Sequence, residues 1–447
     1  LFPTMAHVLN RLICTLLALA PMCAFAQDAD RDTLPANWWT SFQDTVLDSL
    51  ITIGVDNNYD ILMAARRVEI ARQTLNQARS LYYPTLELSG GWKQSRAAGT
   101  TGSAWSLGID MSWQVDIFGK VTAQAKNRKA QWRASRIQRD GMMLTIEAKI
   151  AATYFSLRTL QGQLEVAREQ IASQQKILDI VKARYEAGLN SKLDVAQAQT
   201  VYLSTVASVP TIENNISTTM NALAVLTAMD VDRLKAMVSA GSVVLPPYDR
   251  LLAKEVPSDL LRRRPDIAQA EAVIDADAAA LGVAKKDYLP SLSIQGSIGT
   301  SAHRMGDMFG KNSLSYSIAP TLSWTIFDGL SRKYAVAEAQ EQMQADIDSY
   351  NLTVLNALSE ANNAFGNYDT ALRQIELYAA VANQANEALT LSLDLYTSGL
   401  NSYRDVATAQ LDYLNYTDRL VGAKGSALAA LVAIYEALGG GWNENIN

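Results

Sequence analysis

The sequence predicts a mainly α-helical protein with a small β part, built from two internal structural repeats. Residues 184–203 and 395–414 are identical at twelve of twenty positions and lie 211 residues apart. A proline-free segment of 68 residues with apolar residues at helical spacing leads into each copy, at 119–186 and 330–397. Such a helix would extend roughly 100 Å. Length alone would suggest about two or three ordinary domains, but an internal repeat is the stronger evidence. We therefore expect one body built from two similar halves.

Each repeated stretch predicts the tip of a helical hairpin, at 187–193 and 398–404. Gly188 and Gly399 can take the left-handed conformation that ends a helix. An N-cap serine then precedes an acid by three residues, an arrangement that starts a new helix. These pairs are Ser191 with Asp194 and Ser402 with Asp405.

Residues 1–26 have the pattern of a secretory signal peptide. A basic residue precedes an apolar core at 12–20, and small residues at 24–26 form a cleavage site. The core is too short for a lasting membrane helix. Lipidation of Cys23 is the alternative to cleavage after Ala26. Cys14 and Cys23 are the two cysteines of the sequence, so a chain without this segment would hold neither thiol nor disulfide.

The first repeat, residues 27–257, is expected to contain helices around a β-hairpin. Pro84 stops the first helix, after which apolar residues alternate as in strands. Pro210 should kink the last helix. The expected elements are a helix at 45–82, strands at 85–93 and 105–116 with a polar loop at 95–104, helices at 119–186 and 194–229, and a linker at 230–257.

The second repeat, residues 258–447, follows the same plan. In each half the two short helices together match the long helix in length, which predicts that they stack end to end beside it. The linker and the C-terminal segment would then form a belt around the middle. The expected elements are a helix at 258–288, strands at 292–300 and 314–324, and helices at 330–397 and 405–438.

Four strands of about ten residues have the length of tilted transmembrane β-strands. Four strands cannot close a barrel, and an open edge in lipid leaves backbone groups unsatisfied. Several chains would have to share one transmembrane β-barrel, and three chains would give twelve strands. Tryptophans near the strand ends fit an interfacial aromatic belt. The alternative is a soluble four-stranded sheet that caps a helical rod.

Several motifs resemble those of a known family. They are WQVDIFG at 113–119, LLRRRPDI at 260–267, WTIFDG at 324–329, the two tips, and ALGGGW at 437–442. In this order, and over essentially the whole mature chain, they resemble the outer-membrane efflux proteins of the TolC type, most closely the OprM-like branch. The chain departs from that branch in two ways. Members usually carry a lipidated N-terminal cysteine, whereas Met22 before Cys23 is a poor residue for that processing, and Thr408 stands where members often have a second acid.

The resemblance implies a homotrimer with a twelve-stranded barrel in outer-membrane lipid and an α-helical barrel across the periplasm. Such a passive duct docks with a periplasmic adaptor protein and an inner-membrane transporter of the RND type to expel small molecules. Within the family, the alternative is a duct for secreted polypeptides. From a different class, the alternative is a soluble periplasmic coiled-coil scaffold.

The acids at the tips have two interpretations. As helix caps, Asp194 and Asp405 would each contribute about 1 kcal/mol. In a threefold assembly, three copies of each would instead form carboxylate rings that attract cations at the periplasmic mouth. Nearby side chains would link neighbouring tips and hold the mouth closed. The gate hypothesis covers Asp405, Arg404, Tyr403, Asp194, Tyr396 and Tyr185.

The tips are also candidates for adaptor docking. Capping explains their glycines and serines, but it does not explain an exposed leucine at both tips, whereas contact with a partner's hairpin would. This interpretation depends on the family resemblance. The docking residues are Gly188, Leu189, Asn190, Ser191, Gly399, Leu400, Asn401 and Ser402.

Composition gives little support for other functions. A net charge of −6 provides no basic surface for nucleic acid. The sequence lacks the G-x-x-x-x-G-K-[ST] phosphate-binding motif, and His303 is the single histidine after the signal peptide. We therefore expect no enzyme, no cofactor and no metal site. The arginines at 262–264 are expected to pair with acids of the belt, and Pro265 to begin a helix.

Overall fold

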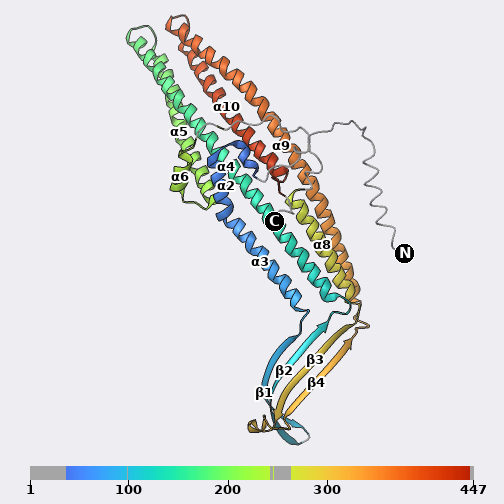
Figure 1. Cartoon of the computed structure of the whole chain (residues 1–447). Coiled ribbons are helices and arrows are strands. Elements are labelled where there is room, and N and C mark those ends of the chain that lie inside the picture. The colour runs from blue at the N-terminus through green and yellow to red at the C-terminus, as the bar shows by residue number, and fades with distance from the viewer. Residues whose placement is uncertain (1–36, 98, 242–244, 246–262, 443–447) are drawn as a thin grey trace, which may run out of the picture. The chain divides into compact units, whose positions relative to one another are not determined.

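A computed structural model describes residues 37–97, 99–241, 245 and 263–442, and Figure 1 shows their arrangement. The predicted signal peptide, Cys23 and most of the linker lie outside these residues. The described part is mainly helical, with one antiparallel sheet. Its elements are η1 (Trp38–Phe42), α2 (Thr45–Asn57), α3 (Tyr59–Ser80), β1 (Thr85–Ala97), β2 (Thr100–Val115), α4 (Lys120–Glu186), α5 (Lys192–Thr227), α6 (Val231–Ser239), α8 (Pro265–Lys286), β3 (Ser291–Ala302), η2 (Met305–Asp307), β4 (Leu314–Ser323), α9 (Ser331–Thr397) and α10 (Tyr403–Ala437).

The two long helices, α4 and α9, each have 67 residues, as their proline-free sequences predict. α4 packs along α3 and α5 of its own half and along α8 and α10 of the other half. α9 packs on α8 and α10 (Figure 1). The prediction that short helices lie beside a long one is confirmed.

The short helices meet end to end at two joints. At the first joint, Asn58 accepts from the Asp60 and Ile61 backbone at the start of α3 and donates to the Leu226 carbonyl at 2.8 Å. At the second, Arg264 precedes α8 and donates to the Ala437 carbonyl at 3.1 Å. The two carbonyls lie 211 residues apart, the offset between the tips.

Matching hydrogen bonds also hold the two hairpins to their helices. The Trp113 indole donates to the Tyr82 carbonyl at 3.0 Å, and the Trp324 indole donates to the Tyr288 carbonyl at 3.0 Å. The tryptophans are 211 residues apart and the tyrosines 206. The first short helix and the first strand of each half therefore follow an offset of 206, and the elements from the second strand onward follow 211.

The strands form one antiparallel sheet in the order β1-β2-β3-β4. The pairs Leu88↔Ile109, Ile109↔Ile298 and Ile298↔Tyr316 set the register. β1 and β4 form the outer edges, and each pairs on one side only within the described chain.

Three expectations about elements were wrong. The helix expected at 45–82 is divided into α2 and α3, because Asn58 takes an extended conformation and caps α3. The polar loop expected at 95–104 is mostly strand, since the β1–β2 ladder continues to Ala97↔Thr100. The linker expected at 230–257 begins with α6, which Asp230 caps through the Asp232 and Arg233 backbone.

The core at the middle of the helices is aromatic. Trp38 stacks on Tyr435 with ring centroids 5.1 Å apart, and Phe42 packs on Phe155 at 4.8 Å. The buried Arg158 ties α6 to this core, donating to the Val238 carbonyl at 3.1 Å. The segment before α2 and the α6 segment thus lie in the belt.

Among the described residues, one helix, α10, is long and apolar enough to cross a membrane by length and composition. Just over half (56%) of its most apolar 18 residues is buried, as expected for a core helix packed on α9 and α4.

Candidate functional site

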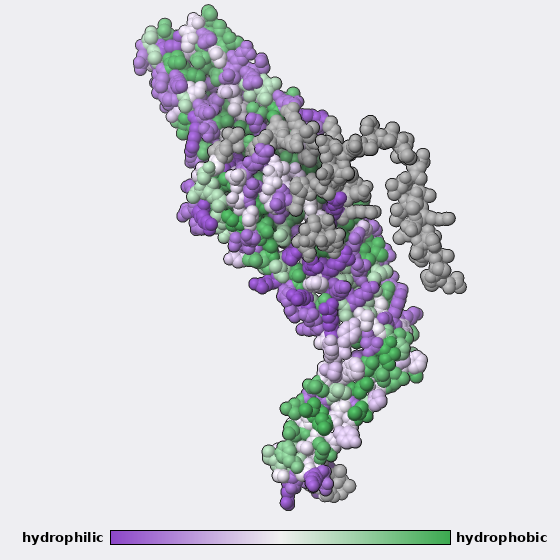
Figure 2. Space-filling model, viewed as in Figure 1, coloured by the Kyte–Doolittle hydropathy of each residue, from purple (hydrophilic) through white to green (hydrophobic). Residues whose placement is uncertain are grey.

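One face of the sheet carries two rows of apolar residues that cross all four strands. The first row is Leu88, Ile109, Ile298 and Tyr316, and the second is Leu86, Met111, Gly296 and Ile318. Leu88 is 73% exposed and Tyr316 80%, so no described part of the chain covers this face. Figure 2 shows apolar residues gathered over the strands at the bottom of the view.

The opposite face of the same strands is polar. Its cross-strand row is Glu87, Asp110, Ser297 and Ser317. The Ser89 hydroxyl donates to Asp110 at 2.9 Å, and the hydroxyls of Ser297 and Ser317 are 2.8 Å apart. A sheet that is apolar on one exposed face and polar on the other has the pattern of a barrel wall between lipid and an aqueous lumen.

The first helical tip is a tight turn closed by its backbone. α4 ends at Glu186, and Gly188 has φ 71°. The Gly188 N–H donates to the Tyr185 carbonyl at 2.9 Å, and the Leu189 N–H donates to the Arg184 carbonyl at 2.8 Å. These bonds satisfy the carbonyls at the helix end, as predicted for a glycine in this place.

α5 begins with a capping box. The Asp194 N–H donates to the Ser191 hydroxyl at 3.2 Å, and the Ser191 N–H donates to the Asp194 carboxylate at 3.1 Å. The predicted capping role of these two residues is confirmed, and the cap occupies one oxygen of the half-buried Asp194.

The second tip repeats the turn but not the cap. Gly399 has φ 74°, and its N–H donates to the Tyr396 carbonyl at 3.0 Å. At the start of α10, however, the Ser402 hydroxyl donates to Asp405 at 2.9 Å, and no side chain caps the helix. Ser402 stands at the N-cap position as expected, but the expectation that this pair caps the backbone was wrong. The exposed Asp405 carboxylate accepts from the Ser402 hydroxyl and from no backbone N–H at the start of the helix.

Three side chains tie the two tips together within the chain. Arg184, at the end of α4, donates to the Thr397 carbonyl at 2.5 Å, and its guanidinium carbon lies 5.0 Å from the centre of the Tyr396 ring. Asn190 donates to the Tyr396 hydroxyl at 2.8 Å and to the Val181 carbonyl at 3.0 Å. Sequence reasoning missed Arg184, whose position at the end of a long helix gave no sign of its partner.

Two tyrosines of the gate hypothesis lie in the core between the tips. Tyr396 is 3% exposed and Tyr403 1%, with their rings edge to face at 5.8 Å. The Tyr403 hydroxyl donates to Gln410 at 3.1 Å. Burial, and then the neighbouring Tyr396, raises the pKa of Tyr403, so this hydroxyl stays protonated at neutral pH. The structure thus places both rings in packing within one chain.

The other residues of the tips are more accessible. Tyr185, Arg404 and Asp405 are exposed, as are the leucines of both tips, Leu189 at 64% and Leu400 at 76%. A groove of about 400 Å³ between α5 and α10 is lined mostly by apolar residues, together with Arg404 and the polar Gln197, Thr200 and Thr408. Its lining includes Leu193, Val201, Ala407 and Leu411.

Comparison with known proteins matches this architecture throughout the chain. The family model described as "Outer membrane efflux protein" matches residues 51–228 and 256–440. The chain belongs to the outer membrane efflux protein family. The predictions of recognition, fold class and outer-membrane localisation are therefore confirmed.

Relatives of this efflux protein include outer membrane proteins of export and efflux and a solved outer-membrane channel. It is 27% identical to the pyoverdine export outer membrane protein OpmQ of Pseudomonas putida, over 91% of this chain and 88% of that one. It is 26% identical to the toluene efflux pump outer membrane protein TtgI of Pseudomonas putida, over 91% and 87%. The solved outer-membrane channel OprN superposes with a TM-score of 0.86 at 26% identity, over 94% of this chain and 98% of that one.

Members of this family are passive outer-membrane channels rather than enzymes. They form homotrimers that work with a periplasmic adaptor and an inner-membrane transporter, so the predicted role as the outer-membrane component of an efflux pump is confirmed. Family membership excludes the soluble scaffold considered from the sequence. Among the described residues, no group of three or more His, Cys, Asp or Glu side chains could hold a metal ion.

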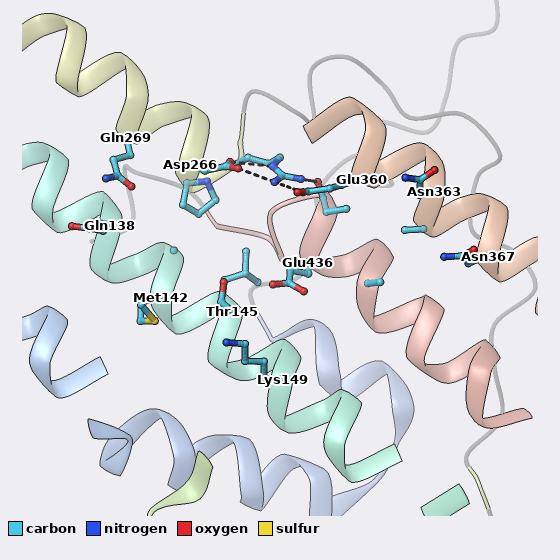
Figure 3. A pocket seen from close by; sticks show the side chains of 17 residues that line it. Gln138, Met142, Thr145, Lys149, Asp266, Gln269, Glu360, Asn363, Asn367 and Glu436 are labelled. Atoms are coloured by element: carbon cyan, nitrogen blue, oxygen red, sulfur yellow. Dashed lines mark hydrogen bonds and ion pairs between the residues drawn. The ribbon is translucent and has the colours of Figure 1, made fainter. Parts of the chain in front are cut away.

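The efflux protein also has a polar pocket of about 700 Å³ where α8 meets α10 (Figure 3). Arg264 lies at its edge and pairs with Asp266 at 2.8 Å and Glu360 at 2.7 Å. Burial alone would lower the pKa of Arg264, but these two acids raise it above its usual value. The prediction that the arginine run pairs with acids is confirmed for Arg264, and Pro265 begins α8 as expected.

Proposed function

We propose that this protein is the outer-membrane exit duct of a tripartite efflux system that expels small molecules. The observation that carries the proposal is the sheet, which in the described chain has an uncovered apolar face and two unpaired edges. If β4 of each copy pairs with β1 of the next, three copies close a twelve-stranded barrel that leaves no edge in lipid. The apolar rows would then face the lipid and the polar face would line the lumen.

Small molecules are the favoured cargo over polypeptides. Two of the relatives are described for pyoverdine export and toluene efflux, and both of these substrates are small compounds. A passive duct takes its selectivity from the transporter behind it, which we propose to be of the RND type. We assign the duct itself no catalytic step.

We further propose that the tips form the gate at the periplasmic end. Asp405 is the leading candidate because its carboxylate is exposed and free of the helix cap, whereas Asp194 is engaged in one. Three copies of Asp405 would form an acidic ring, with Arg404 beside each member. Tyr396 and Tyr403 would act indirectly, by fixing the position of the second tip against the first. Tyr185 is exposed at the rim of the tips.

The exposed leucines and the groove between α5 and α10 support docking of the adaptor at the same end. Leu189 and Leu400 project from the turns into solvent, and a second protein's hairpin would remove them from water. Gly188 and Gly399 shape the turns, and Asn190 and Ser191 hold the first of them. Asn401 accepts from the Ser402 N–H and holds the second.

Single-channel conductance of the detergent-extracted protein in a planar bilayer tests the duct, with the oligomeric mass measured on the same sample. We expect a trimer with small, cation-preferring currents. A monomeric mass together with no insertion would contradict the proposal, because four strands alone cannot form a pore.

The gate is tested by removing its charges. The double substitution Arg404→Ala and Asp405→Asn should raise the conductance several-fold and weaken the preference for cations. Asp412→Asn, an exposed acid further along α10, is the matched control and should leave both unchanged. If the double variant conducts like the parent protein, these residues do not gate the mouth.

A further inference from the structure

One face of α3 and one face of α9 are exposed in the single chain. Their equivalents in the other repeat, on α8 and α4, pack against each other within the chain. α8 corresponds to α3 at an offset of 206 residues, and α9 corresponds to α4 at 211, as the tyrosine and tryptophan bonds of the two hairpins show. Inside the chain, α4 packs along α8. The corresponding contact would join α9 of one copy to α3 of another.

α3 and α8 share one buried face but differ in the other. Ile61 and Leu75 of α3 are buried, and so are their equivalents in α8, Ile267 and Leu281. α8 has a second buried face, formed by Ala268, Ala272 and Ala276 against α4. The equivalents on α3 are all exposed: Leu62, Arg66 and Ile70.

The long helices show the same difference. Asn127, Ala134 and Ile137 of α4 meet α8, and Ala134 and Ile137 are buried there. Position 130 lies on the same face by helical spacing. The equivalent face of α9 is exposed and acidic. It consists of Glu338, Glu341, Ala345 and Asp348.

Two contacts fix the register of the internal seam. Asn127 donates to the Ala276 carbonyl at 2.7 Å, and a Cβ added at Gly141 would lie 3.2 Å from the Pro265 Cβ. Adding 211 to Gly141 and subtracting 206 from Pro265 gives the equivalent pair between copies, which is Leu352 and Tyr59. These side chains are 58% and 72% exposed in the single chain, and they are apolar.

The middle of the transferred seam is charged. Between the two anchor points the register sets Arg66 opposite Ala345, with Glu341 and Asp348 one turn away on either side. From 338 to 348, α9 has four acids and no base, while α3 has three arginines between 66 and 72 and one acid, Glu69. The Asn127 bond is not reproduced, because the side-chain carboxylate of its equivalent, Glu338, has no N–H to donate.

We propose that the seam between copies in the trimer is formed by α3 of one copy and α9 of the next, in this register. Arg66 lies between Glu341 and Asp348 of the neighbouring copy, and Tyr59 packs on Leu352. Opposite charges therefore specify the seam between copies, where alanines form the seam within a copy. The inference depends on the trimeric duct proposed above.

Disulfide trapping tests the register. The natural cysteines, Cys14 and Cys23, lie in the predicted signal peptide, so introduced thiols report cleanly. The Cβ spacing at the internal equivalent is close to that of a disulfide. Tyr59→Cys with Leu352→Cys should convert more than half of the protein to covalent trimer on oxidation. Each single variant should remain monomeric in denaturing gels. The pair Ala65→Cys with Leu352→Cys is the matched control and should also remain monomeric, because Ala65 is the equivalent of Glu271, which is exposed and lies outside the internal seam.

Charge reversal tests the electrostatics. Arg66→Glu should lower the temperature at which the trimer dissociates in detergent, and the further changes Glu341→Arg and Asp348→Arg should restore it. Arg72→Glu, on the outward face of the same helix, should have no effect. A trimer that conducts normally but neither cross-links nor responds to Arg66→Glu would overturn the seam and leave the duct intact. If only an added adaptor protects the thiol of the Tyr59→Cys variant from alkylation, this face belongs to the adaptor and the seam is overturned.

Discussion

At the residue scale, equivalent joints in the two halves use different chemistry. The first joint is bridged by the neutral amide of Asn58, and the second by the guanidinium of Arg264. Arg264 makes three interactions at once, with a helix-end carbonyl and with two carboxylates from different helices. A planar guanidinium can serve all of these partners, whereas lysine would serve them poorly.

Replacing Arg264 should destabilise the joint. Arg264→Met keeps the apolar stem but leaves the Ala437 carbonyl and Glu360 without their donor, so we expect a loss of about 1–3 kcal/mol. The acids are partly exposed, which keeps the cost below that of a fully buried pair. Denaturant unfolding of the detergent-solubilised protein measures the change. As a control, Arg373→Met breaks an exposed ion pair with Asp369 and should lower the free energy of unfolding by less than about 0.5 kcal/mol. If both variants lose the same amount, Arg264 has no special role at the joint.

At the element scale, α8 and α9 bring two carboxyl groups into contact. Burial, and then a hydrogen bond and repulsion from Asp346, raises the pKa of Asp277 from its usual 3.8 to about 6. Because the folded state holds this proton more tightly than the unfolded chain, the packing of α8 on α9 weakens as the pH rises from the usual pKa to the raised one. Above pH 6 the penalty is complete, and below the usual pKa it is absent.

Asp277→Asn should remove this pH dependence. The amide cannot ionise, so the variant should be more stable than the parent at pH 8, by about 1 kcal/mol once solvent screening is included, and much closer to it at pH 4. Unfolding midpoints at the two pH values give the comparison. Asp275→Asn is the control, since Asp275 pairs with Arg133 instead of an acid. A parent-like pH profile in Asp277→Asn would show that the carboxyl pair does not influence stability.

At the scale of the whole molecule, the sheet determines where the protein resides. Its apolar rows have no cover in the described chain, and adjacent residues on one strand face opposite sides. Neighbouring positions on β3 should therefore respond in opposite ways to a charge.

Ile298→Lys places a charge on the apolar face and should cost about 2–4 kcal/mol if the site lies near the middle of the bilayer. We expect less trimer in the outer-membrane fraction and loss of heat-resistant trimer in gels. Ser297→Lys, one residue earlier on the polar face, should assemble normally. If the two variants behave alike, the apolar rows do not face lipid.

The sequence by itself determined the repeat, the long helices, the four strands and the turn glycines, because periodicity, proline positions and φ-permissive residues act locally. It also determined the family, through motifs spread along the chain. Only the tertiary structure decided that residue 58 divides a helix, that Asp194 caps while Asp405 does not, and that Tyr396 and Tyr403 are buried. The break at residue 58 and the burial of Tyr396 involve partners distant in sequence, the Leu226 carbonyl and Arg184, and hydrophobic spacing carries no information about such partners. The two caps differ in the group that the serine hydroxyl bonds, and the shared Ser-x-x-Asp pattern does not reveal that choice.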